Sequence, residues 1–148
     1  MIERHAPQVS ESEVLRLDNQ IGFLLRRAYQ RHASLFNRFM PDGLTPTQSS
    51  ALIRLLEHGP ISQNRLGRQI ALDAATIKGV VDRLNARGLV AVESDEEDHR
   101  RVAITLTEEG RRFTTGYLRK VEELAEATLK PLDVDERDAF LSALHRIC

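Results

Sequence analysis

A run of charged residues near the middle of the chain has the side chains needed to bind phosphate. Four acidic residues at 95–98 lead directly into His99, Arg100 and Arg101, and a short β-branched run lies on either side. A guanidinium group binds phosphate or carboxylate oxygens through paired hydrogen bonds, so Asp98 can hold Arg100 in position for an anion. The acids before Asp98 would repel phosphate. We interpret them as turned outward, which makes the loop selective rather than generally adhesive.

A second concentration of basic residues lies upstream of this loop. The segment at 62–87 has five basic and two acidic residues, a local charge of +3, whereas the chain of 148 residues has a net charge of −1. Its basic residues are Arg65, Arg68, Lys78, Arg83 and Arg87. Arginines in a loop are, by themselves, usually solvated surface residues. Binding to a polyanion such as DNA depends more on where the basic residues cluster than on the net charge of the chain.

The basic segment is predicted to fold as two short helices. Ser62 is a candidate N-cap of the first helix, and Asp73 is a candidate N-cap of the second, which Gly88 should end as a C′ glycine. Two short helices joined by a few residues are a helix-turn-helix candidate. The apolar residues of both helices are expected to face inward: Leu66, Ile70, Ile77, Val80, Val81 and Leu84.

The neighbouring elements complete the order of a known motif. Upstream, Thr45 and Gln48 have capping-box spacing around Pro46, which predicts the start of another helix. Downstream, the runs at 89–92 and 102–106 have strand composition and predict a hairpin around the charged loop. Three helices and a hairpin form a winged helix-turn-helix. In this motif the last helix before the hairpin enters the major groove of DNA, and the hairpin can reach the minor groove.

Long helical segments flank this unit. Apolar residues recur at helical spacing over about 10–39, and a second, weaker apolar face accompanies the first. A further long helix is predicted at 111–129 and a short amphipathic helix at 132–147. A long helix with two apolar faces has more surface to bury than one small core requires, so we expect it to pack against a partner subunit.

These elements predict a mainly α-helical fold with a small β-hairpin. The length favours a single domain over 1–148. Within it, 44–110 is expected to form the winged helix-turn-helix unit, and 10–40 and 111–148 a helical dimerisation region.

The stretch "DHRRVAITLTEEG" resembles the wing signature of the MarR family of ligand-responsive transcription regulators. That signature is Asp-x-Arg, a short gap, an apolar residue, x, Leu-Thr, two variable residues and Gly. The fixed positions are filled here by Asp98, Arg100, Leu106, Thr107 and Gly110. "LTPTQ", "DRL" and "GLV" also resemble the family, so the match covers about 44–110. The flanking helices agree with the family in layout only.

The resemblance implies a winged helix-turn-helix protein flanked by N- and C-terminal dimerisation helices. It implies a homodimer that binds a pseudo-palindromic operator in double-stranded DNA and is released by a small effector. The resemblance favours repression of transcription, the usual activity in the family, and transcriptional activation is the alternative. A winged helix that serves only protein–protein contacts is a second alternative, but such a module is expected to lack the basic segment and the loop arginines.

The last helix before the hairpin is expected to approach the bases. The Lys78 ammonium group can donate hydrogen bonds to a phosphate or to guanine. A glycine inside a helix costs roughly 1 kcal/mol relative to alanine. Either close approach of the backbone to DNA or a steric need inside the protein would explain Gly79. The DNA-contact candidates on this helix are Ala74, Ala75, Thr76, Lys78 and Gly79.

Phosphate contacts are expected from the elements on either side. Free amides and polar side chains at the start of the preceding helix suit phosphate oxygens. Arg83 can read DNA, but pairing with a carboxylate that braces the helix is the favoured interpretation. The remaining DNA-contact candidates are Ser62, Gln63, Asn64, Asp98, Arg100 and Arg101.

One histidine lies on the main apolar line of the first long helix. His32 falls between Ala28 and Leu35, and a buried histidine there is most often satisfied by a partner in the core. In proteins of the family that this chain resembles, effectors bind between the dimerisation helices and the DNA-binding unit. His32, with Arg26 or Arg27 near it, could neutralise the carboxylate of a small aromatic acid.

Several functions lack support in the sequence. No phosphate-binding glycine loop, nucleophile elbow, HExxH motif or zinc-ligand pair is present, so neither an enzyme nor a metal or cofactor site is expected. The acidic run lacks the central glycine and the twelfth-position glutamate of an EF-hand. Peroxide sensors of similar layout have a reactive cysteine in the first long helix, whereas Cys148 is the only cysteine here. No secretory or membrane-spanning segment is evident, so a cytoplasmic location is expected.

Overall fold

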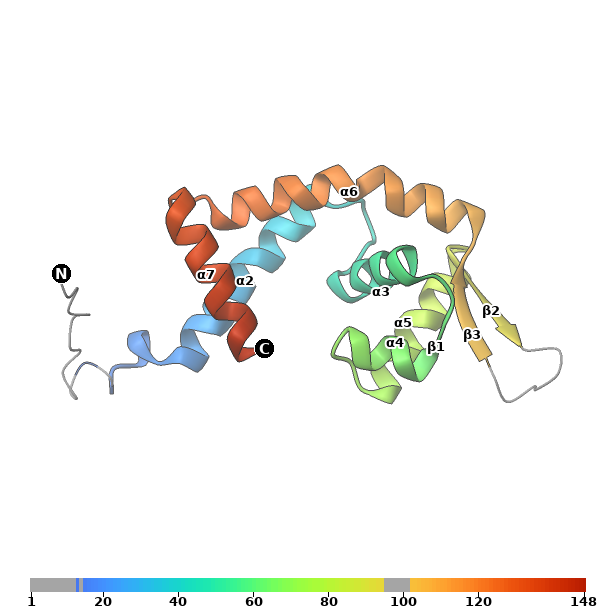
Figure 1. Ribbon diagram of the computed structural model, residues 1–148, viewed down its shortest axis with the longest axis horizontal. Helices are drawn as coiled ribbons and strands as arrows, with labels where there is room; N and C mark the ends of the chain where they lie inside the picture. The colour runs from blue at the N-terminus through green and yellow to red at the C-terminus, as the bar shows by residue number, and fades with distance from the viewer. Residues whose placement is uncertain (1–12, 14, 95–101) are drawn as a thin grey trace.

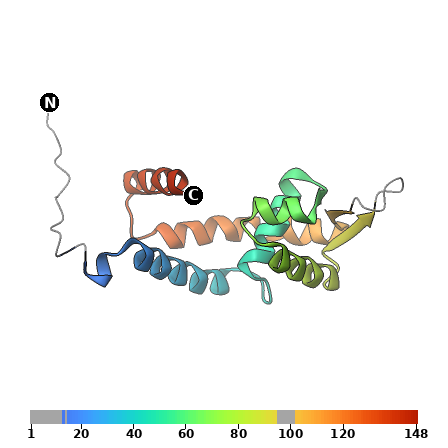
Figure 2. The same cartoon turned by 90° about the horizontal axis from the view of Figure 1, so that it is seen from below.

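The computed structural model describes residues 13, 15–94 and 102–148 (Figure 1). Helix α6 spans the molecule. The helix-turn-helix unit lies under its first half, and α2 and α7 lie beside its second half. Seen from below, α6 runs between α2 and α7 (Figure 2). In chain order the elements are the 3-10 turn η1 (Leu17–Asn19), α2 (Ile21–Phe39), α3 (Pro46–His58), β1 (Ile61–Ser62), α4 (Gln63–Gln69), α5 (Ala74–Ala86), β2 (Val90–Ser94), β3 (Val102–Leu106), α6 (Glu108–Leu129) and α7 (Val134–Ile147).

The first long helix is shorter than the sequence predicts. It begins at Ile21 rather than near residue 10, because Gln20 has an extended backbone with φ −76° and ψ 128°. The side-chain amide of Asn19 donates a hydrogen bond of 2.7 Å to the carbonyl of Glu13. Asparagine side chains that bind nearby backbone groups compete with helix formation, which accounts for the break. The expected helical positions 10–12 and 14 lie outside the described residues.

The predicted helix caps are confirmed. Thr45 Oγ1 accepts a hydrogen bond from the backbone N–H of Gln48 at 3.2 Å, and the Gln48 side chain accepts one from the N–H of Thr45. Ser62 caps α4 through the N–H of Arg65 at 3.3 Å. Asp73 caps α5, and the backbone of Gly88 turns left-handed with φ 73° after its last turn. These caps fix the directions in which α3, α4 and α5 leave their loops.

The wing belongs to a three-stranded sheet, not a simple two-stranded hairpin. Its strand order is β1-β3-β2, with both pairs antiparallel. Ile104 of β3 is opposite Ile61 on one side and Val92 on the other. The sequence analysis missed β1 because its two residues are too few to show an alternating pattern. This third strand ties Ala103 and Ile104 of β3 to the start of α4.

The hydrophobic core lies inside the helix-turn-helix unit and under α6, and it extends to Phe36 and Met40 at the end of α2 and to Leu124 in the second half of α6. The hydroxyl groups of Tyr117 on α6 and Ser49 on α3 lie 3.3 Å apart, so α6 is joined to the unit by a polar contact as well as by packing. The largest fully buried apolar side chains are Leu52, Leu55, Leu66, Ile77, Leu84, Ile104 and Tyr117.

The ends of the molecule away from this core keep large apolar side chains exposed. All residues of α7 are described, and none of them is buried; on α2 the only buried residue is Phe36. None of the described helices is both long and apolar enough to cross a membrane. The exposed apolar side chains of the two helices are Ile21, Leu24, Leu25, Tyr29, Val134, Phe140, Leu141 and Ile147.

Candidate nucleic-acid interface

Helix α5 separates an apolar inner face from a polar outer face, as the sequence predicts. Its four inward residues, Ile77, Val80, Val81 and Leu84, are all buried. At its start, Asp73 Oδ1 accepts a hydrogen bond of 2.7 Å from the N–H of Thr76, and this bond lowers the pKa of the Asp73 carboxyl. The outer face is available to a partner. Its exposed residues include Ala74, Ala75, Thr76, Lys78, Asp82 and Arg83, with Gly79 half-buried.

Lys78 has an acidic neighbour that the sequence analysis did not pair with it. Its Nζ atom lies 2.7 Å from Asp82 Oδ2, one helical turn further on. About two thirds of each side chain is exposed, 66% for Lys78 and 61% for Asp82. The i,i+4 spacing is the signal that could have revealed this pair. The outer face of α5 therefore presents a cation and an anion side by side.

The structure separates the two explanations for Gly79. A Cβ atom at this position would meet only the Arg83 guanidinium, at 3.6 Å, which is an ordinary van der Waals contact. A steric need inside the protein is therefore not found within the described part of the chain. Gly79 is half-buried on the outer face of α5, where only the Arg83 guanidinium lies close to it.

The environment of Arg83 differs from the ion pair that the sequence analysis favoured. Among the described residues, no carboxylate lies within 4.0 Å of its guanidinium, so the expected bracing ion pair is not found there. The guanidinium lies against Gly79 on the exposed side of the helix. Toward the residues that the structure describes, the five donors of Arg83 are unused, and they lie on the same face as Lys78.

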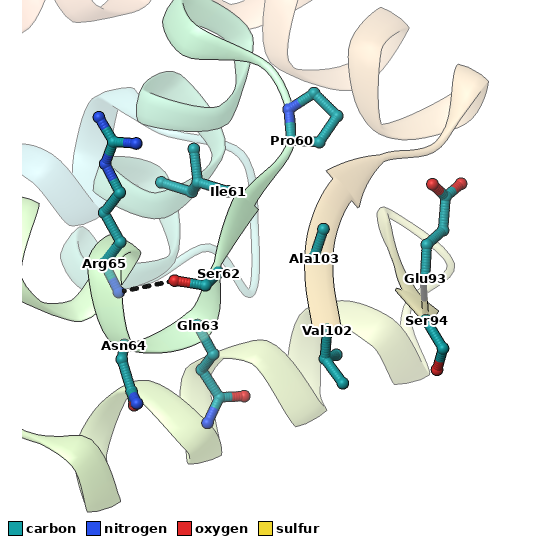
Figure 3. Close-up of a pocket in the computed structure, with 10 residues that line it drawn as sticks. All are labelled: Pro60, Ile61, Ser62, Gln63, Asn64, Arg65, Glu93, Ser94, Val102 and Ala103. Atoms are coloured by element: carbon teal, nitrogen blue, oxygen red, sulfur yellow. Dashed lines mark hydrogen bonds between the residues drawn. The ribbon is translucent and has the colours of Figure 1, made fainter. Parts of the chain in front are cut away.

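An open groove of about 1090 Å³ lies between the start of α4 and the wing (Figure 3). Gln63 and Asn64 come from the first turn of α4, directly after the capping residue Ser62. Their side chains point to the same side as those of Ser94 and Val102, where the described parts of the wing end. The groove brings the three polar candidates of α4 next to the wing.

The tip of the wing lies outside the described residues. Strand β2 ends at Ser94 and β3 starts at Val102. The segment between them contains the acidic run together with Asp98, Arg100 and Arg101, and their expected contacts with DNA stay a prediction.

The candidate effector residues lie at the other end of the molecule, where α2 crosses α6. Half-buried His32 places Nδ1 3.0 Å from Thr128 Oγ1, and burial lowers the pKa of the His32 ring. Arg31, which the sequence analysis overlooked, donates to the carbonyl oxygens of Ala127 at 2.9 Å and Thr128 at 2.5 Å. The interpretation of His32 as a histidine with a partner in the fold is confirmed by Thr128.

The two arginines proposed to lie near His32 are exposed. Arg27 places its guanidinium 5.8 Å from the centre of the Phe23 ring. In the part of the chain that the structure describes, neither Arg26 nor Arg27 has a hydrogen bond or ion pair to His32. The basic side chain that the fold brings beside the His32 partner is Arg31. A residue 97 positions away in the sequence supplies its acceptor, so no local pattern could have indicated it.

Comparisons with known proteins agree with this geometry. A family model described as the MarR family matches residues 42–101. The HTH-type transcriptional repressor NicR of Pseudomonas putida is 40% identical over 129 residues, which cover 86% of this chain and 82% of the repressor. The crystal structure of a probable transcriptional regulator from Pseudomonas aeruginosa is 47% identical, with a TM-score of 0.87, and the alignment covers 90% of this chain and all of that one.

A further solved relative is the Bordetella bronchiseptica protein BpsR, described with a mechanism for regulation of its DNA binding by 6-hydroxynicotinic acid. It is 38% identical to this chain with a TM-score of 0.84, and the alignment covers 89% of this chain and 95% of BpsR. The exposed face of α5, the adjoining wing and these relatives together lead to one assignment. The chain belongs to the MarR family of winged helix-turn-helix, DNA-binding transcriptional regulators.

Proposed function

We propose that the protein is a homodimeric repressor that binds a pseudo-palindromic operator and is released by a small aromatic acid. The observation that carries the proposal is the outer face of α5, where the exposed Lys78 and Arg83 lie on either side of Gly79, which has no side chain. The major groove of B-form DNA admits a helix of this kind. A symmetric dimer would place two such helices in successive major grooves of one duplex.

Base contacts come from the first turns of α5 in this proposal. Ala74, Ala75 and Thr76 approach the base edges, and Thr76 offers a methyl group to thymine as well as a hydroxyl. Lys78 reaches guanine, while Gly79 lets the helix backbone come close to the duplex. These assignments follow from the exposure of the residues on one face of α5.

Phosphate contacts surround the base-reading face. Ser62, Gln63 and Asn64 offer donors at the start of α4, and the Arg83 guanidinium is free to bind phosphate. At the wing, Asp98 orients Arg100, and both arginines enter or flank the minor groove, where the potential is most negative. The residues of the wing tip are Asp98, Arg100 and Arg101.

The dimer interface is assigned to the flanking helices. Apolar side chains that a monomer leaves in water gather on the first half of α2 and on α7. Burying them against a second copy removes their apolar area from water, which favours association. Parts of the flanking regions at 10–40 and 111–148, among them Phe36, Tyr117 and Leu124, belong to the core of the helix-turn-helix unit at 44–110. The exposed apolar faces of α2 and α7 are the parts that the proposal assigns to the dimer.

The effector is assigned to the chemical class that relatives bind. BpsR is regulated by 6-hydroxynicotinic acid, an aromatic carboxylic acid that also has a hydroxyl group. In this chain the Thr128 hydroxyl donates to the Leu124 carbonyl at 2.8 Å, so its oxygen accepts from Nδ1–H of His32. Neutral His32 then keeps Nε2 as a proton acceptor. A bound carboxylate would favour protonation of Nε2 and the charged ring.

Replacing His32 tests the effector site. His32→Ala should bind DNA with near-normal affinity and lose release by 6-hydroxynicotinic acid or related acids, measured by fluorescence anisotropy of labelled operator. Because burial lowers the pKa of His32, carboxylate binding to wild type should strengthen as pH falls from 8 to 6, by at most about tenfold per unit. His32→Ala should lose this dependence, and His58→Ala should keep it. Normal release from His32→Ala would discard the site.

Replacing an arginine of the wing tests the DNA-binding surface. Arg100→Ala should weaken operator binding by about 1–3 kcal/mol, because a phosphate or groove contact is lost. The slope of log affinity against log salt should also become flatter, since fewer counterions are released. Arg119→Ala is the matched control, because Arg119 is 88% exposed on α6. Unchanged affinity and salt slope for Arg100→Ala would remove the wing from the mechanism.

A further inference from the structure

An acidic residue lies in the middle of the surface assigned to DNA. Asp82 is exposed on the outer face of α5, and its Oδ2 atom holds the Lys78 ammonium at 2.7 Å. Exposed ion pairs of this kind contribute little to stability. A carboxylate facing a polyanion also weakens binding that lacks sequence preference. The position of Asp82 therefore calls for a role in recognition rather than in folding or general affinity.

The two side chains form a compact donor–acceptor unit. The Lys78 ammonium group has three N–H donors and uses one of them for Asp82, so two can donate to a base. The Asp82 carboxylate has acceptor capacity beyond its bond to Lys78. Both residues lie on the same face one helical turn apart, beside Gly79, where a Cβ atom would meet only the Arg83 guanidinium. A base pair facing this part of α5 would meet donors next to an acceptor.

We propose that Lys78 and Asp82 together read one G·C base pair in each half of the operator. Guanine presents two adjacent acceptors, N7 and O6, and cytosine N4 beside them is a donor. Lys78 binds the two guanine atoms and Asp82 accepts from cytosine N4. An A·T pair places its donor between two acceptors, so Lys78 has no adjacent pair of acceptors there. The inference rests on the proposed binding of α5 to DNA and assigns the base that this surface selects.

Asp82 also acts against incorrect sites. Where no cytosine N4 donor lies opposite, the acceptor capacity of the carboxylate beyond its bond to Lys78 finds no partner on the base, and its negative charge lies near phosphate, which costs binding energy. The ion pair keeps Lys78 from a loose phosphate contact at such sites. Asp82 is thus a specificity-determining residue, and its removal should trade selectivity for general affinity.

The test measures base preference for the wild type and for variants of this pair. A duplex selected from a random pool by wild-type protein is changed one base pair at a time, and binding is measured at one fixed salt concentration. At one position in each half-site, the preference of the protein for G·C over other base pairs should fall roughly tenfold in Asp82→Ala. Lys78→Ala should weaken the preference at the same position. Asp82→Ala should also bind random-sequence DNA more tightly than wild type.

Two further variants separate recognition from structure. Asp82→Asn should shift the preference at that position toward A·T, because an amide pairs with adenine N6 and N7. Glu123→Ala removes the acid of another exposed i,i+4 pair, with Arg119 on α6, and should leave every base preference unchanged. Circular dichroism checks that each variant is folded.

Specific outcomes would overturn the proposal. It fails if Asp82→Ala keeps the wild-type preference at every position, if Lys78 and Asp82 affect different positions, or if the shared position prefers A·T. These outcomes differ from failure of the proposed function, in which wild-type protein binds no duplex and no preference can be measured.

Discussion

Gly110→Ala is expected to destabilise the protein by about 3 kcal/mol or more, since the new side chain has no space. A Cβ atom at this position would overlap the carbonyl oxygen of Leu89 and lie 2.8 Å from its carbonyl carbon. Both are backbone atoms at the start of the wing, so no rotation of a side chain relieves the overlap. The helix start and the first wing strand would have to separate.

That separation would break a group of hydrogen bonds between the two segments. The Thr107 N–H donates to the Leu89 carbonyl at 3.1 Å, and the Thr107 hydroxyl donates to the Gly88 carbonyl at 2.6 Å. The N–H of Gly110 in turn donates to Thr107 Oγ1 at 2.9 Å. Leu-Thr-x-x-Gly in the wing signature therefore has a structural reason. The threonine joins the start of α6 to the wing, and the glycine allows the two backbones to touch.

Denaturant unfolding at matched protein concentrations measures this effect. Gly116→Ala is the control on the same helix, because nothing lies within 4 Å of the Cβ atom that it would add. It should stabilise the protein by about 0.5–1 kcal/mol, as alanine restricts the unfolded chain more than glycine does. Equal unfolding midpoints for Gly110→Ala and wild type would show that the contact between α6 and the wing is looser than described.

Phe140→Asp is expected to raise the dissociation constant of the proposed dimer by roughly a hundredfold or more. Complete burial of an exposed phenylalanine is worth about 1.5–3 kcal/mol. An interface gains the part of this that corresponds to the area still exposed, twice in a symmetric dimer. Phe140 is 42% exposed on α7, and its neighbours Leu141 and Ile147 are also exposed. An aspartate at this position would add the cost of burying a charge. Operator binding should fall with the dimer, because two half-sites need two linked recognition helices.

Sedimentation equilibrium over a range of protein concentrations measures this change. Ser142→Asp introduces the same charge on α7, two positions away and close to the opposite side of the helix, where exposed residues face solvent. It should leave the dissociation constant within a few-fold of wild type. A Phe140→Asp protein that stays dimeric at low concentration would exclude α7 from the interface.

Features that depend on short stretches of sequence could be predicted from the sequence. The capping box at Thr45 and Gln48, the caps at Ser62 and Asp73, and the inward face of α5 all follow from spacing within one or two helical turns. Local hydrogen bonds and a 3.6-residue period determine them, so the residue types suffice. The order of the elements predicted a winged helix-turn-helix, and the family signature added the expected homodimer, operator and effector.

Features that depend on three-dimensional proximity were missed or misassigned. Strand β1 needs its partner β3 to become visible, because two residues have no pattern of their own. Arg31 binds carbonyl groups at the end of α6, which no spacing along the chain predicts. The start of α2 was placed too early because the apolar period continues through Gln20, whereas the backbone there is extended.

The proposed DNA-binding face of α5 has some features that the local sequence predicts and others that only the three-dimensional structure shows. Exposure of Lys78 followed from the inward stripe of α5, and the structure confirms it, whereas Gly79 is half-buried. The partner of Lys78 and the freedom of Arg83 needed side-chain positions. Asp82 belongs to the family-like "DRL" stretch, but only the side-chain positions show that its carboxylate contacts Lys78.

The central claim is that a symmetric pair of chains presents the α5 surfaces and the wings to one duplex. Binding of wild-type protein to a selected duplex, followed by sedimentation and by anisotropy across a salt series, tests it most directly. The account predicts two chains per duplex and an affinity whose logarithm falls linearly with the logarithm of salt concentration. A protein that stays monomeric, or one that ignores every duplex offered at low ionic strength, would contradict it.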